Sequence, residues 1–275
     1  MPPRRSSYFM ASCLLGLLGA CSSVPRTGIA SLANGSIAYS LTGMQTPSSV
    51  PVVLQAGLGD GMAVWTSLIP ELERSSPVFA YDRPGYGDSD SVTGPRDPCS
   101  IASEERRLLL AAGLQPPYIL VGHSLGGLYQ YAYAKLYPEE VAALLLLDPT
   151  HPDHWHRMQQ DALAAAALLK AARATLFSAV EKREFDEQAA CLSRLDMTTP
   201  LRVPTRLLVH ANASLLEQAA FNSVQHRLQL DWLRLTSARQ LDTVPGSGHH
   251  MQTDDPAAVL RAIAELAKGP PHHTP

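Results

Sequence analysis

The sequence predicts an α/β fold built around a mostly parallel β-sheet. Short apolar runs bounded by Pro, Gly or Asp are typical of strands buried on both faces of such a sheet. These runs are residues 50–54, 78–81, 118–121 and 141–147. Helical patterns lie between several of them, notably over residues 101–112 and 125–137. Strand and helix therefore alternate along the chain, as in proteins with parallel sheets.

The composition fits a soluble globular protein with one main core. Of 275 residues, 45% are hydrophobic and 17% are charged, which argues against disorder and against several membrane spans. The formal net charge is -3, and like charges form no block. We therefore expect no nucleic-acid partner.

The first twenty residues have the zones of an export signal. Arg4 and Arg5 precede an apolar run over residues 8–18 that is too short to span a bilayer comfortably. The following Leu-Gly-Ala-Cys resembles the lipobox of bacterial lipoproteins, which are cleaved before a cysteine that is then acylated. We expect a signal peptide over residues 1–20 and a lipidated Cys21; an ordinary secretory signal is the alternative.

The lipoprotein resemblance implies a cell-envelope location. Two or more acyl chains anchor a protein stably, and Ser22 after the cysteine resembles the outer-membrane sorting class. We expect an outer-membrane lipoprotein that faces the periplasm, with residues 21–28 as its tether. In that compartment Cys99 and Cys191 can form a disulfide, although two separate buried thiols are the alternative.

The domain is expected over residues 29–268. It opens with a hairpin in residues 29–40, whose Asn34-Gly35 suits a type I′ turn. Residues 151–199 show no strand signal and hold an Ala-rich helical stretch over residues 161–180, which predicts a helical cap after Leu147. The remaining expected elements are strands 206–211 and 239–243, a helix from Pro256 to about Lys268 and a loose tail over residues 269–275.

A candidate nucleophile lies at Ser124, within Gly122-His123-Ser124-Leu125-Gly126. The G-x-S-x-G motif sits between a predicted strand and a predicted helix, where a strained turn presents the serine hydroxyl. Its glycines let the strand and the helix pass closely, and the helix start leaves the amide of Leu125 available for an oxyanion. A turn serine without chemistry is the alternative.

Three motifs together resemble the α/β-hydrolase fold superfamily, close to its capped esterases and peptidases. They are Gly57-Leu58-Gly59, Asp82-Arg83-Pro84-Gly85-Tyr86-Gly87 and the serine motif, and the resemblance covers residues 29–268. Ala56 stands where the family usually has His. Because the family's oxyanion donors are backbone amides, the resemblance still implies Leu58 and Leu125. Residues 82–87 are interpreted as a scaffold that braces the oxyanion turn.

The resemblance also implies a base and an acid downstream of the serine. His249, in Gly246-Ser247-Gly248-His249-His250, is the expected base, and His250 is interpreted as a packed or solvated neighbour. His123 is given a structural role. The usual acid position reads Asn212-Ala213-Ser214, followed by Glu217. Some members carry the acid one strand earlier, so we expect Asp148, with Glu217 or a purely structural Asp148-Pro149 turn as alternatives.

The function expected from these residues is a membrane-anchored serine hydrolase of modest-sized carboxylic esters, with a small ester or acyl substrate. Other Ser-dependent chemistry, including C–C bond hydrolysis, and a catalytically silent binding lipoprotein remain alternatives. A proline-releasing aminopeptidase would need an acidic cap residue for a free amine; Glu181, Glu184 and Glu187 are the candidates.

His151, His154 and His156 lack the carboxylate pattern of a hydrolytic metal site, so we expect neither a metal nor a cofactor. The sequence predicts no oligomeric state.

Overall fold

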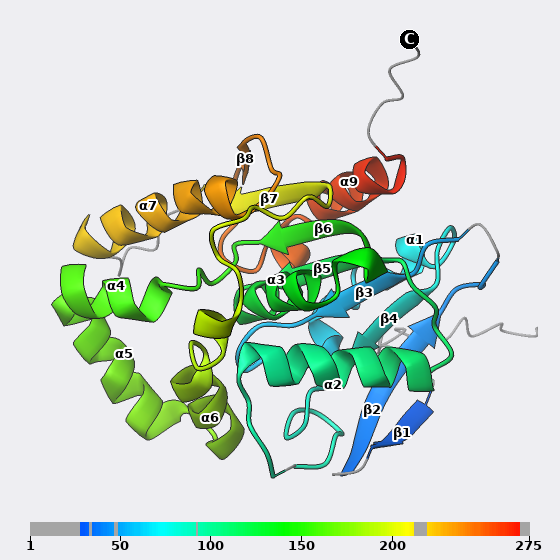
Figure 1. The fold of residues 1–275 in the computed structure, drawn as a ribbon, viewed down its shortest axis with the longest axis horizontal. Coiled ribbons are helices and arrows are strands. Elements are labelled where there is room, and N and C mark those ends of the chain that lie inside the picture. Colours follow the sequence, from blue (N-terminus) through cyan, green and yellow to red (C-terminus); the bar gives the residue numbers. More distant parts are fainter. Residues whose placement is uncertain (1–27, 33–34, 47–48, 92, 212–218, 270–275) are drawn as a thin grey trace, which may run out of the picture.

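The computed structural model describes residues 28–32, 35–46, 49–91, 93–211 and 219–269, which form an eight-stranded sheet flanked by helices (Figure 1). The strand order is β1-β2-β4-β3-β5-β6-β7-β8. β1 pairs with β2 and β2 with β4 in antiparallel fashion, whereas the other neighbours are parallel. The strands are β1 Gly28–Leu32, β2 Gly35–Thr42, β3 Val52–Gln55, β4 Val78–Tyr81, β5 Tyr118–His123, β6 Val141–Leu147, β7 Thr205–His210 and β8 Leu241–Val244.

Both faces of the sheet are covered by helices, which explains the continuous apolar runs of the central strands. Along β5, Tyr118 and Leu120 belong to one hydrophobic cluster, and Ile119 and Val121 belong to another. Helices α2 (Pro98–Ala111) and α3 (Leu125–Leu136) cover the first face, and α1 (Ile69–Leu72) and α9 (Pro256–Ala267) cover the second. Short helices at Met62–Trp65, Pro138–Glu140, Leu192–Arg194 and Met251–Asp254 (α8) complete this layer structure.

A helical cap follows β6, as predicted. It comprises α4 (His154–Asp161), α5 (Leu163–Leu176) and α6 (Ala179–Glu187), at the left of Figure 1. The helical stretch expected over residues 161–180 is divided, because Ser178 starts a new helix through a capping box with Glu181.

The sequence analysis overlooked α7 (Ala219–Leu235). Its buried residues Val224, Leu228, Trp232 and Leu235 recur at helical spacing. Val224 and Leu228 pack against Met158 of α4, Ala166 of α5 and Ala162 between these helices. This helix, which lies between β7 and β8 in sequence, therefore supports the cap.

The predicted α/β architecture and the position of the cap are confirmed, with strand ends shifted by one or two residues. The expected bridge between Cys99 and Cys191 is present and joins the start of α2 to the segment after α6. None of the helices in the described ranges is long and apolar enough to cross a membrane. The expected signal peptide, Cys21, Asn34, Glu217 and the tail after Gly269 lie outside those ranges.

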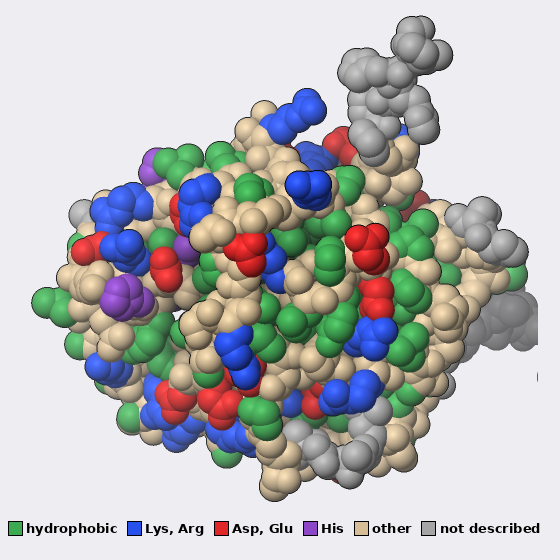
Figure 2. Space-filling model, in the orientation of Figure 1, with side chains coloured by type: hydrophobic (Ala, Val, Ile, Leu, Met, Phe, Trp, Pro, Cys, Tyr) green, Lys and Arg blue, Asp and Glu red, His purple; other side chains and the backbone are tan. Residues whose placement is uncertain are grey.

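Charged side chains of both signs are interspersed over the face of the molecule drawn in Figure 2. Among the ion pairs of the described residues are those of Arg173 with Asp186 and of Arg106 with Glu140. This surface agrees with a composition in which acidic and basic residues nearly balance.

Candidate active site

Ser124 occupies a strained turn between β5 and α3. Its backbone has φ 52° and ψ -122°, an unfavourable region for a residue with a side chain, which costs of order 1–3 kcal/mol. A Cβ atom on Gly122 would lie 2.5 Å from the carbonyl oxygen of Gly126, and one on Gly126 would lie 2.3 Å from that of Gln55. Only glycine therefore allows this close crossing. Ser124 itself is partly exposed.

The turn at residues 57–59 lies against this serine. A Cβ atom on Gly57 would be 3.2 Å from the Cβ of Ser124. The amide of Leu58 belongs to this turn, and the amide of Leu125 is the first of α3, where helical amides have no partner within the helix. The two amides expected to bind an oxyanion therefore come from segments that meet at Ser124.

Arg83 braces the turn from within the protein. Its guanidinium donates hydrogen bonds to the carbonyl oxygens of Ala56, at 2.6 Å, and Gly57, at 2.7 Å. The same group donates to both carboxylate oxygens of Glu184 in α6, at 2.9 and 3.0 Å. The side chains of Arg83 and Glu184 are 1% and 0% exposed. A buried ion pair thus connects the cap to the turn at residues 57–59.

This network also bears on the aminopeptidase alternative. The hydroxyl of Tyr86 donates to Glu184 as well, at 2.9 Å, so its carboxylate is fully engaged inside the protein. One oxygen of Glu187 accepts the backbone N–H of Arg96, and Glu181 caps α6. The structure therefore gives each of the three candidate carboxylates a contact within the protein.

Replacing Glu184 with glutamine is expected to leave Arg83 charged and buried without its counter-charge. We expect a loss of about 3–5 kcal/mol in the free energy of unfolding, measured by urea denaturation. Glu71→Gln is the matched control, because its pair with Arg74 is 56% and 71% exposed, and should cost less than about 1 kcal/mol. Equal losses in the two variants would contradict the role assigned to the buried pair.

His249 and Asp148 lie in direct contact. His249 belongs to the loop between β8 and α8, and its Nδ1 is 2.5 Å from Oδ2 of Asp148. Asp148 follows β6 directly and is 2% exposed. The backbone N–H of Ser124 donates to the carbonyl of Leu147 at 2.9 Å, and that of Thr150 donates to the carbonyl of Ser124 at 2.9 Å. The parallel pairing of β5 and β6 therefore sets Asp148 beside the turn of Ser124.

The protonation of this pair follows from its contacts. Burial alone would raise the pKa of Asp148. Hydrogen bonds from His210 and His249 outweigh burial and hold this pKa well below its usual range. An ionised carboxylate only accepts hydrogen bonds, so Nδ1 of His249 carries the proton. The Nε2 atom of a neutral His249 ring then keeps its lone pair and can accept a proton.

The sequence analysis missed His210, which ends β7 between the strands that lead to Asp148 and His249. Its Nδ1 donates to Oδ2 of Asp148 at 2.8 Å, and Nε2 of Gln229 in α7 donates to Oδ1 at 3.4 Å. Both residues hold the carboxylate in place. The position of His210 at the end of a predicted strand, on the edge shared with Asp148, was the available signal.

The histidines at the start of the cap do not gather into a metal cluster among the described residues. Nε2 of His151 lies 3.1 Å from Asp231, and Nδ1 accepts the backbone N–H of Asp153 at 3.0 Å. Nε2 of His151 therefore connects the start of the cap to α7, and Nδ1 holds the turn that leads into α4.

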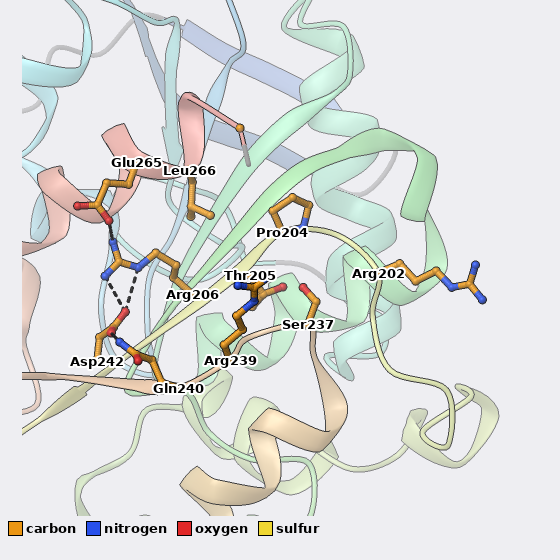
Figure 3. A pocket seen from close by; sticks show the side chains of 11 residues that line it. Arg202, Pro204, Thr205, Arg206, Ser237, Arg239, Gln240, Asp242, Glu265 and Leu266 are labelled. Carbon is orange, nitrogen blue, oxygen red and sulfur yellow. Dashed lines mark hydrogen bonds and ion pairs between the residues drawn. The ribbon is translucent and has the colours of Figure 1, made fainter. Parts of the chain in front are cut away.

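A pocket of about 610 Å³ lies at the amino ends of strands β7 and β8 (Figure 3). Arg206, near the start of β7, pairs there with Asp242 of β8 and Glu265 of α9. The serine, acid and histidine candidates all follow the carboxyl ends of their strands. This pocket is therefore remote from them.

Residues 50–196, more than half of the chain, match a protein family described as alpha/beta hydrolase fold. The (lyso)-N-acylphosphatidylethanolamine lipase of Mus musculus is 34% identical over 107 residues, which are 36% of this chain and 30% of the lipase. An uncharacterized protein of Bacillus subtilis is 32% identical over 106 residues, covering 38% of this chain and 42% of that protein. The matches thus span less than half the length of either relative.

The fold is also found among solved structures. An alpha/beta hydrolase fold protein from Burkholderia ambifaria superimposes with a TM-score of 0.60, covering 88% of this chain and 98% of that chain. The sequence identity is 20%, so the likeness concerns the fold alone. Its 88% coverage of this chain exceeds the part that the family match spans, residues 50–196.

Proposed function

Because the chain belongs to the alpha/beta hydrolase fold family, we propose that it is a serine hydrolase that cleaves carboxylic esters of modest size. The observation that carries the proposal is the contact between Asp148 and His249 beside the strained turn of Ser124. The ester class is supported by a relative named as a lipase. It is also supported by the buried Glu184, whose carboxylate is held by Arg83 and Tyr86 rather than open to a substrate amine.

In the proposed mechanism, Ser124 Oγ attacks the ester carbonyl while Nε2 of His249 takes the hydroxyl proton. Asp148 fixes the His249 tautomer and stabilises the imidazolium that forms. The amides of Leu58 and Leu125 bind the oxyanion. The imidazolium then protonates the leaving alcohol, and an acyl-enzyme remains on Ser124. Water attacks this acyl-enzyme by the same route in reverse, which releases the acid and restores the serine.

A fluorophosphonate probe and a panel of aryl esters of graded acyl length test this proposal together. Covalent labelling with stoichiometry near one per chain, and turnover that falls beyond a certain acyl length, are the expected results. A folded protein that neither labels nor turns over any ester would instead be a binding lipoprotein with a hydrolase fold. Labelling without ester turnover would retain the serine mechanism and reject the ester substrate.

We further propose that the protein is anchored to the outer membrane through lipid on Cys21, as its N-terminal sequence indicates. Cys21→Ala is expected to move the protein from the membrane fraction to the soluble fraction of the envelope or to a precursor form. Its ester turnover should change less than about threefold, because the domain expected from the sequence begins beyond the tether of residues 21–28. Fractionation followed by immunoblotting measures the outcome. Retention of the variant in the membrane fraction would contradict lipid anchoring.

A further inference from the structure

Three side chains that can bind a metal meet beside the candidate nucleophile. Asp60 follows the oxyanion turn, His123 precedes Ser124 and His250 follows His249. Their potential ligand atoms all lie within 4.8 Å of one another. Oδ2 of Asp60 is 3.8 Å from Nδ1 of His123 and 3.4 Å from Nε2 of His250. None of the three has a role in the mechanism proposed above.

The ring of His123 offers an unused lone pair to this cluster. His123 is 1% exposed, and its Nε2 lies 2.8 Å from the carbonyl oxygen of His249. Because a carbonyl oxygen only accepts, Nε2 carries the ring proton and Nδ1 does not. Burial lowers the pKa of His123 to about 3, which keeps the ring neutral. Nδ1 has no hydrogen-bond partner among the described residues, so this buried atom faces Asp60 and His250 unsatisfied.

We propose that Asp60, His123 and His250 form a binding site for a divalent zinc ion. Neutral imidazole and carboxylate are the ligand types that zinc takes, at about 2.0–2.2 Å, so ligand atoms in a tetrahedral site lie about 3.3–3.5 Å apart. The distance between Asp60 and His250 already fits, and that between Asp60 and His123 must shorten slightly. A fourth position remains for water.

The surroundings agree with such a site. Metal-ligating histidines commonly donate the other ring N–H to a backbone carbonyl or a carboxylate, and His123 does so toward His249. A Cβ atom on Gly57 would lie 3.1 Å from Nδ1 of His123 and 3.5 Å from Oδ2 of Asp60, so glycine leaves room next to both ligands. The side chains of His250 and Asp60 are 49% and 27% exposed, which gives an ion access from solvent.

A second group of potential ligands, Asp148, His210 and His249, is equally compact but differs in protonation. Both Nδ1 atoms there donate to Oδ2 of Asp148, so each of these atoms carries a proton instead of a free lone pair. Zinc would have to displace two hydrogen bonds. Nδ1 of His123 has no hydrogen bond among the described residues for zinc to displace. A zinc ion there would join the segments that carry Leu58, Ser124 and His249.

Zinc titration of the disulfide-containing chain tests the proposal. Protein without an affinity tag, freed of metal by a chelator, is titrated with Zn²⁺ in competition with a chromophoric chelator. One tight site per chain is expected. Asp60→Asn and His250→Gln should each weaken binding at least about 100-fold, beyond the 10–100-fold that loss of a supporting contact costs. Circular dichroism and urea midpoints without zinc check that both variants fold.

The matched control is His226→Gln, which removes an exposed histidine of α7 and should leave the zinc affinity unchanged. A double variant, His272→Gln with His273→Gln, tests the tail and should also bind normally. Unchanged affinity in folded Asp60→Asn or His250→Gln would overturn the proposal. Loss of zinc binding in His210→Gln or in the tail variant, with binding retained in Asp60→Asn and His250→Gln, would also overturn the proposal.

Discussion

Replacing Ser124 with alanine is expected to abolish fluorophosphonate labelling and to lower ester turnover by about 10³- to 10⁶-fold. The variant removes the only atom that forms the acyl bond in the proposed mechanism, while the oxyanion amides and the Asp148–His249 pair remain. Alanine keeps the Cβ atom, so the backbone strain at φ 52° is the same in both proteins. The measurement is kcat/KM with an aryl ester, on protein whose fold is checked by circular dichroism.

Ser223→Ala is a suitable control, because Ser223 is an exposed residue of α7 whose hydroxyl contacts Arg227. This variant should label and turn over ester like the natural protein. Undiminished turnover in Ser124→Ala would reject the nucleophile. Labelling that persists in Ser124→Ala would mean that the probe reacts with another residue.

The parts of the site that the sequence predicted depend on local signals. Ser124 stands between a strand and a helix that can be recognised within about ten residues of sequence. The glycines on either side of it indicate the close approach of strand and helix that the turn requires. Asp148 and His249 could be proposed because the family resemblance implies an acid and a histidine downstream of the serine, and each candidate lies just beyond an expected strand. The carboxyl ends of parallel strands share one edge of the sheet, so such residues converge.

The remaining contacts could not be predicted, because they join segments that are distant in sequence. Glu184 reaches Arg83 across 101 residues, and nothing in the sequence near Glu184 distinguishes it from the other acidic residues of the same helix. His210 contacts Asp148 across 62 residues, and this contact depends on the neighbouring places of β6 and β7 in the sheet. The strand order, which the alternation of elements leaves open, decides both the role of His210 and the cluster around His123.

Asp148→Asn is expected to preserve the fold and to lower turnover by about 10²- to 10⁴-fold, mainly through kcat. The amide carries no charge, so the imidazolium that forms on His249 during attack is no longer stabilised. The hydrogen bonds open to an amide at position 148 are also unfavourable. If its oxygen accepts the hydrogen bonds from His210 and His249, its NH₂ group must face Nε2 of Gln229, which is a donor 3.4 Å from the present Oδ1.

Glu217→Gln provides the comparison that assigns the acid, since Glu217 is the first carboxylate after the usual acid position. We expect it to change turnover less than about tenfold, because Asp148 already accepts hydrogen bonds from both His210 and His249. Both variants are measured with one ester, and the pH profile of kcat separates a lost base partner from a general loss of packing. A larger loss in Glu217→Gln than in Asp148→Asn would assign the acid to Glu217. The contact between Asp148 and His249 would then be structural.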